Sequence, residues 1–135
     1  MKSIGLFFIL LLLLSAGGCK KDNNGKAISD GNYSGKFLAG NQNGWTLKDS
    51  VGVSLQSGQF NSLTSSLTLP TGKGSYQVEG GTVTFTNMIA FPDNTSVVTT
   101  AVLNGSYSYA VKGDSIFLSK TDVGQNVYTY KLKRQ

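Results

Sequence analysis

Residues 103–111, LNGSYSYAV, decide the fold. Their bulky side chains, Leu103, Tyr107, Tyr109 and Val111, share one parity with Gly105, and small or polar residues lie between these positions. Because successive side chains of a β-strand point to opposite faces, this alternation predicts a strand with one buried face and one solvated face. Strands of this kind are typical of antiparallel sheets.

The same period of two recurs on both sides of this stretch, and no window has the apolar spacing of a helix. Residues 116–118, Ile-Phe-Leu, interrupt the alternation, so we expect Phe117 to face outward. We therefore predict an all-β protein. The alternating positions are Tyr33, Gly35 and Phe37; Trp45 and Leu47, with Val51, Val53 and Leu55 at the same parity; Tyr76 and Val78; Val83 and Phe85; and Tyr128, Tyr130 and Leu132.

Short glycine turns separate these runs. Ser57-Gly58, Gly80-Gly81 and Lys112-Gly113-Asp114 each suit a tight hairpin, so about eight strands should pair in sequence order. An open meander exposes two strand edges, and closure into an up-and-down barrel removes both. We predict that residues 30–135 form one such barrel, with a two-sheet β-sandwich as the alternative.

The segment before this domain has a different composition. An apolar run from Ile4 to Leu14 follows Lys2 and ends in small residues, which is the order of a secretory signal peptide. The run is shorter than the roughly 20 residues of a membrane-spanning helix. We predict a signal peptide at residues 1–18, and a flexible polar tether at residues 19–29 that begins with Cys19.

Residues 16–19, Ala-Gly-Gly-Cys, resemble the lipobox of bacterial lipoproteins. The resemblance implies that Cys19, the only cysteine, is acylated and anchors the protein in a membrane. Residues 20–26, directly after Cys19, contain lysine and aspartate. They are similar to the segments that follow the acylated cysteine in Gram-negative lipoproteins of the outer membrane. The implied location is therefore the cell envelope, lipid-anchored, at the outer membrane. The alternative is ordinary secretion with a free thiol.

The predicted barrel resembles the small bacterial lipocalin-like lipoproteins. Its first strand begins Gly31-Asn32-Tyr33, and its last strand contains residues 128–132, Tyr-Thr-Tyr-Lys-Leu. Lipocalins begin Gly-x-Trp and stack an arginine of the last strand on that Trp; Tyr33 and Arg134 take these places here. The resemblance implies binding of one small apolar or amphipathic ligand. An eight-stranded barrel can instead fill its interior with side chains.

The composition gives little support for catalysis. The chain has no histidine, and most of its seven carboxylates lie in predicted turns, where they accept backbone N–H groups. A glycosidase-like pair, for instance Asp49 with Glu79, is the enzymatic alternative. Nucleotide-binding glycine loops and nucleophile elbows are absent from the sequence. We therefore expect no enzyme activity, no cofactor and no metal.

The charge balance does not indicate a nucleic-acid partner. The chain has 12 basic and 7 acidic side chains, and Lys2 lies in the predicted signal peptide. The densest basic cluster is Lys131, Lys133 and Arg134. We expect it on a solvated face, with contact to anionic lipid or lipopolysaccharide as the alternative.

Aromatic residues are the candidate ligand-binding residues. Inward tyrosines would give a pocket both apolar surface and hydroxyl groups, although tyrosines of this kind also serve as core. Trp45 follows the polar residues 41–44 and would stack on a sugar ring, cap the barrel mouth or join the core. Phe91 lies in an apolar connection, residues 88–98, that would form a lid or a plug. The full set is Tyr33, Trp45, Phe91, Tyr107, Tyr109, Tyr128 and Tyr130.

Two functions remain open at this point. The first is a non-enzymatic, lipid-anchored, lipocalin-like protein that binds a small apolar or amphipathic molecule. The alternative is a structural or interaction module that docks on an envelope protein or a polysaccharide through its outer face and loops.

Overall fold

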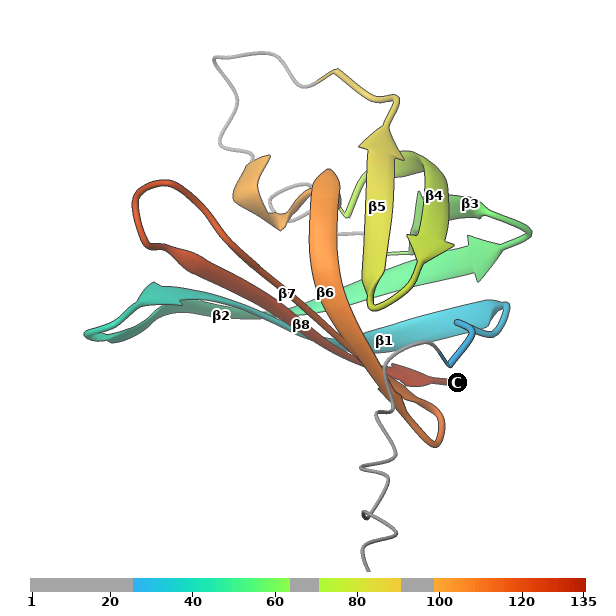
Figure 1. The fold of residues 1–135 in the computed structure, drawn as a ribbon, viewed down its shortest axis with the longest axis horizontal. Helices are drawn as coiled ribbons and strands as arrows, with labels where there is room; N and C mark the ends of the chain where they lie inside the picture. Colours follow the sequence, from blue (N-terminus) through green and yellow to red (C-terminus); the bar gives the residue numbers. More distant parts are fainter. Residues whose placement is uncertain (1–25, 64–70, 91–98) are drawn as a thin grey trace, which may run out of the picture.

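The structure is a computed structural model that describes residues 26–63, 71–90 and 99–135. Each strand pairs antiparallel with its neighbours in sequence, and the last pairs with the first, so the sheet closes into a barrel (Figure 1). The prediction of an all-β up-and-down barrel is confirmed, and the sheet is not a sandwich. The strands are β1 (Gly31–Asn41), β2 (Gly44–Gln56), β3 (Gln59–Ser62), β4 (Lys73–Glu79), β5 (Thr82–Asn87), β6 (Gly105–Lys112), β7 (Ser115–Thr121) and β8 (Val127–Arg134), with a 3-10 turn, η1 (Thr99–Ala101), before β6.

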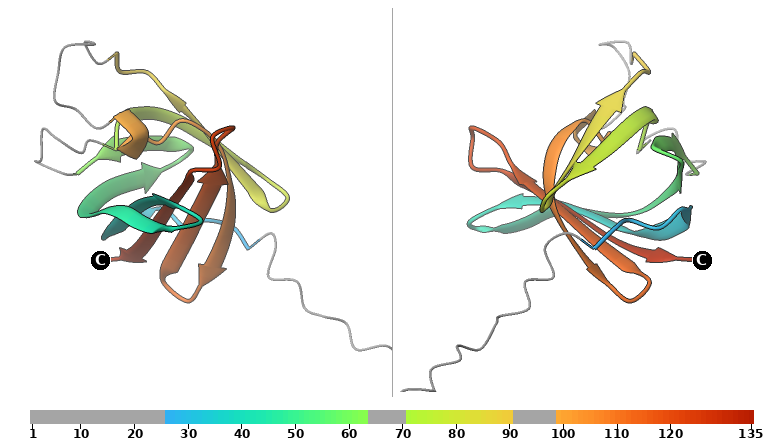
Figure 2. Two further views of the ribbon diagram at one scale, coloured as in Figure 1. Left: turned by 90° about the vertical axis from the view of Figure 1, so that its left-hand side faces the viewer. Right: turned by 45° about the vertical axis from the view of Figure 1, so that its right-hand side comes forward.

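The two ends of the barrel differ in their connections. At one end, here called the turn end, two-residue turns at 57–58, 80–81 and 113–114 join neighbouring strands. Gly80 and Gly113 both have φ 57, a backbone conformation that favours glycine. The opposite end, called the loop end, carries the tip of the β1–β2 hairpin, the β7–β8 connection and η1 (Figure 2).

Aromatic side chains fill the barrel axis. Neighbouring ring centroids lie 4.9 to 6.0 Å apart, which is the range of favourable aromatic contacts. The inward faces of the strands therefore meet in a packed core. The rings that form this chain, in spatial order, are Phe60, Phe85, Tyr107, Tyr130 and Phe37.

The last residue of η1 and the residues that follow it close the loop end. Ala101 and Leu103 are both fully buried and belong to the core cluster. The Tyr130 hydroxyl donates to the Ala101 carbonyl, and the Leu103 N–H donates to the Thr71 carbonyl at 3.0 Å. Thr71, itself buried, donates its hydroxyl to the Gly52 carbonyl at 3.1 Å. The core is thus sealed by backbone from two connections.

The chain enters the barrel at the turn end. The Tyr33 hydroxyl donates to the Ser29 carbonyl at 2.6 Å, and the Tyr109 hydroxyl donates to the Lys26 carbonyl at 3.2 Å. Ile28 packs against the core between these two contacts. Residues 26–29 therefore cover the turn end.

A bulge near the loop end changes the prediction for Trp45. Leu47 pairs with Ala39 while Trp45 pairs with Gly40, so Thr46 is an extra residue in β2. The Thr46 hydroxyl donates to the Ala39 carbonyl at 3.1 Å. Leu47 packs against the core, whereas Trp45 is 45% exposed. The prediction that Trp45 continues the inward face of β2 is therefore wrong, because the extra residue reverses the alternation.

Candidate functional site

Four of the seven candidate aromatic residues lie in the core. Tyr33, Tyr107, Tyr109 and Tyr130 are at most 5% exposed. The hydroxyl groups of Tyr33, Tyr109 and Tyr130 bond backbone carbonyls. These tyrosines hold the two ends of the barrel closed, which is the core role that sequence reasoning had left open.

Tyr107 differs from the other core tyrosines. Its hydroxyl is buried and has no hydrogen-bond partner in the part of the chain that the structure describes. Burial raises the pKa of Tyr107 to about 12, and the nearby Asn104 backbone and Tyr130 hydroxyl oppose this shift in part. The Lys120 ammonium lies 4.7 Å from the centre of the Tyr107 ring. The ring thus connects the core to a charged group at the loop end.

Tyr128 is half-buried and lies at the loop end, where a hollow of about 330 Å³ opens to solvent. We call this hollow the mouth groove. The β1–β2 and β7–β8 hairpins extend on the same side of the barrel in Figure 1 and contribute most of the lining. The lining residues are Ala39, Gly40, Asn41, Thr46, Leu47, Thr100, Asn126 and Tyr128.

A hydrogen-bonded carboxylate fixes the β7–β8 side of the mouth groove. Asp122 accepts bonds from the Asn126 backbone N–H at 3.0 Å, from the Asn126 amide, and from the Tyr128 hydroxyl at 2.9 Å. The bonds from Asn126, more than that from Tyr128, lower the pKa of Asp122. Tyr128 also stacks on Phe37, with 5° between the ring planes. Its position is therefore set from two directions.

Lys120 is an inward-facing charge at the same end. It follows Ile116 and Leu118 on the inner face of β7, and its ammonium donates to the Asn104 carbonyl at 2.8 Å. Burial lowers the pKa of Lys120, and the charge of Asp122 opposes the shift. The alternation of residues 116, 118 and 120 was the sequence signal for this position.

Most of the large exposed apolar side chains lie in or beside the connections of the loop end. Among the described residues, only Val78 of this group lies near a turn-end hairpin. Val123, between β7 and β8, is fully exposed, and Trp45 lies next to the groove residue Thr46. The loop-end members are Trp45, Leu63, Met88, Ile89 and Val123. Phe91 lies outside the described residues.

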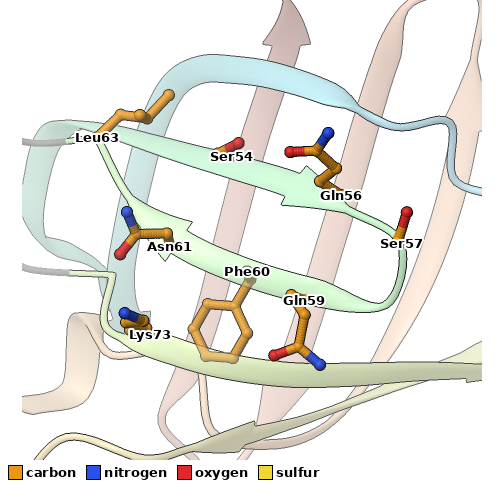
Figure 3. Close-up of a pocket in the computed structure, with 8 residues that line it drawn as sticks. All are labelled: Ser54, Gln56, Ser57, Gln59, Phe60, Asn61, Leu63 and Lys73. Atoms are coloured by element: carbon orange, nitrogen blue, oxygen red, sulfur yellow. The ribbon is translucent and has the colours of Figure 1, made fainter.

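A larger hollow of about 580 Å³ lies on the outer face of β2, β3 and β4 (Figure 3). Gln56, Gln59 and Asn61 project from adjacent strands there, together with Lys73. Phe60 also lines it, but this side chain is 2% exposed and belongs to the core. The hollow thus presents amide groups without an accessible aromatic face. The mouth groove, in contrast, has both amide groups and the half-buried ring of Tyr128.

The described ranges contain no group of three or more His, Cys, Asp or Glu side chains placed to hold a metal ion. They also contain no helix with the length and apolar character needed to span a bilayer.

Comparison with known proteins gives no match, whether with protein-family models, curated proteins or solved structures. The closed barrel of eight antiparallel strands fits a lipocalin-like fold. Arg134 is the cross-strand partner of Tyr33 and lies against Gly31. The likeness therefore rests on topology and on this pairing at the turn end.

Sequence reasoning found Tyr128 but missed most of the groove. Ala39 and Leu47 were hidden within strands, and Asn126 was one polar residue of a connection. These residues meet because β8 returns to pair with β1, a contact between distant parts of the chain. The polar segments 41–44 and 122–126 were the only local signal.

Proposed function

We propose that this chain is a non-enzymatic, lipid-anchored binding protein that takes a small amphipathic molecule in the mouth groove. The observation that carries the proposal is the groove between two hairpins at the end opposite to the one where the chain enters. The lipocalin-like resemblance supports the same class of ligand. The acylated residue would be Cys19, and the location would be the outer membrane of a Gram-negative bacterium.

The lining of the groove supports an amphipathic ligand. Ala39, Leu47 and the Tyr128 ring offer apolar surface, while Asn41 and Asn126 offer amide groups. Small-molecule sites combine these features, and their volumes run from about 300 to 1,000 Å³. A groove of about 330 Å³ suits a ligand of modest size.

The packed axis determines where the ligand would lie. Aromatic rings occupy the position that a central lipocalin ligand would take, and Ala101 and Leu103 cover them at the loop end. The ligand in this proposal therefore rests on the rim of the barrel. An anchor before Lys26 would leave that rim facing away from the tether.

Native mass spectrometry tests the proposal. The chain from Lys20 onward, gently purified, should retain a small molecule or bind octyl glucoside below its micelle concentration. Leu47→Ser should weaken this binding about tenfold, because it removes apolar surface from the groove. Val78→Ser, an apolar-to-serine change at an exposed position near the turn end, should not. Equal binding by both variants, or no binding by the unchanged chain, would refute the groove as the site.

A docking module is the second candidate, and the exposed apolar residues of the loop end favour it. In that case Trp45 and Val123 would contact an envelope protein or a polysaccharide. Photo-crosslinking from position 123 in intact cells should recover one dominant partner. Crosslinks spread evenly over many abundant proteins would count against this function.

A further inference from the structure

Four adjacent strands of the barrel carry an unbalanced positive charge. β6, β7, β8 and β1 contain no Asp or Glu. Lys36 pairs directly with Lys131, and Lys133 lies two residues further along β8, so all three project from the outer face. Lys112 adds a fourth exposed lysine from β6. We call these four lysines together with Phe117 the basic face.

The strands of the basic face carry no carboxylate, and Asp114 lies in the turn beyond Lys112. Two like charges directly opposite each other on neighbouring strands are unfavourable. Lys36 donates to the neutral Ser50 hydroxyl at 2.8 Å, and no described carboxylate forms an ion pair with any of the four lysines. The arrangement therefore favours an external anion.

An aromatic residue lies among these lysines. Phe117 pairs across the strands with Lys131 and is only half-buried, and the Lys112 ammonium lies 6.0 Å from its ring centre. Aromatic and basic side chains on one surface are typical of segments that contact the interface of an anionic bilayer. A site that bound a soluble polyanion by charge alone would gain nothing from the apolar ring of Phe117.

We propose that the basic face docks on the anionic headgroups of the membrane to which the chain is tethered. The proposal adds an orientation to the proposed function, and it uses the expected anchor at Cys19 only to bring the surfaces together. Lys26 follows Cys19 by seven residues, so an extended tether spans at most about 25 Å. The basic face would thus stay within reach of the headgroups, and the loop-end groove would remain free.

Vesicle co-sedimentation of the non-acylated chain from Lys20 onward tests this docking without the lipid anchor. This chain contains the whole closed barrel and its core. Binding to phosphatidylcholine vesicles with about one third phosphatidylglycerol should exceed binding to pure phosphatidylcholine at least tenfold, and about 1 M salt should abolish the difference.

Matched charge variants locate the docking surface. Lys131→Gln with Lys133→Gln should weaken binding to the anionic vesicles at least tenfold, since each lysine near such a surface contributes about a fivefold gain. Lys48→Gln with Lys73→Gln, the same change of net charge on β2 and β4, should weaken it by less than about threefold. Phe117→Ser should also weaken it, and this loss should persist as salt rises.

Three results would overturn the proposal. One is an equal loss in both double variants, which would show a nonspecific effect of net charge. Another is binding that does not depend on anionic lipid. The third is tight binding to heparin or duplex DNA without vesicle binding, which would assign the face to a soluble polyanion. Far-ultraviolet circular dichroism of each variant separates these outcomes from loss of the fold, and the mass of the mature N-terminus tests Cys19 acylation independently.

Discussion

The buried Tyr107 hydroxyl makes a testable contribution to stability. Because it has no hydrogen-bond partner among the described residues, its burial is unfavourable. Tyr107→Phe removes the hydroxyl and keeps the ring contacts with Phe85 and Tyr130. We expect this variant to increase the free energy of unfolding by about 1 kcal/mol, measured by urea denaturation.

Tyr130→Phe is the matched control. This variant loses the bond to the Ala101 carbonyl that holds the loop end closed, so it should decrease the free energy of unfolding by about 1 kcal/mol. If both variants destabilised the protein equally, Tyr107 would have a partner that the structure does not identify.

The hydrogen bonds of Asp122 predict a pH-dependent change of structure that is confined to the β7–β8 connection. Bonds from Asn126 and Tyr128 lower the pKa of Asp122 from its ordinary value of 3.8. A carboxylate with a lowered pKa in the folded state stabilises it above the ordinary pKa, and this contribution disappears as pH falls through the lowered value. The Asn126 amide resonance should therefore shift below pH 3.8.

The Asp122→Asn variant should lack this transition while the strand resonances stay unchanged. Nuclear magnetic resonance titration measures both. A midpoint above 3.8 for Asp122 would contradict the hydrogen-bonded geometry of the mouth groove.

At the scale of the elements, Gly35 lies where β1 has no room for a side chain against the backbone of β8. A Cβ atom at this position would lie 1.9 Å from the Lys131 carbonyl oxygen and 3.0 Å from the Leu132 Cα. Both atoms are backbone, so the strands must move apart to accept a side chain. Gly35→Ala should lower the free energy of unfolding by about 2 kcal/mol in thermal or urea denaturation.

Ser34→Ala, one residue earlier and on the exposed face of β1, is the control and should change stability by less than about 0.5 kcal/mol. A Gly35→Ala protein as stable as the Ser34→Ala protein would show that the barrel closes without this close contact.

The strands and tight turns could be predicted from sequence because their signals are local. Alternation placed Tyr107 and Tyr109 on the inner face of β6, and Gly80 located a two-residue turn. The bulge at Thr46 could not be predicted, because it depends on the register between β1 and β2. The burial of Ala101 was equally hidden, since an apolar residue within a connection has no periodicity to interpret.

At the scale of the whole molecule, the barrel separates three surfaces. The turn end receives the chain from Lys26, the loop end bears the mouth groove, and the basic face runs along β6, β7, β8 and β1. The groove was beyond sequence reasoning because it joins residues near position 40 to residues near position 127. The proposed ligand binding and the proposed membrane docking would therefore use separate sites.

Hydrogen–deuterium exchange with and without octyl glucoside tests most directly whether a small amphipathic molecule binds in the mouth groove. Protection should increase in peptides covering residues 39–47 and 126–128, and exchange at the turn 113–114 should not change. Protection at the turn end, on the outer hollow of β2 to β4, or nowhere at concentrations that give binding would contradict the account.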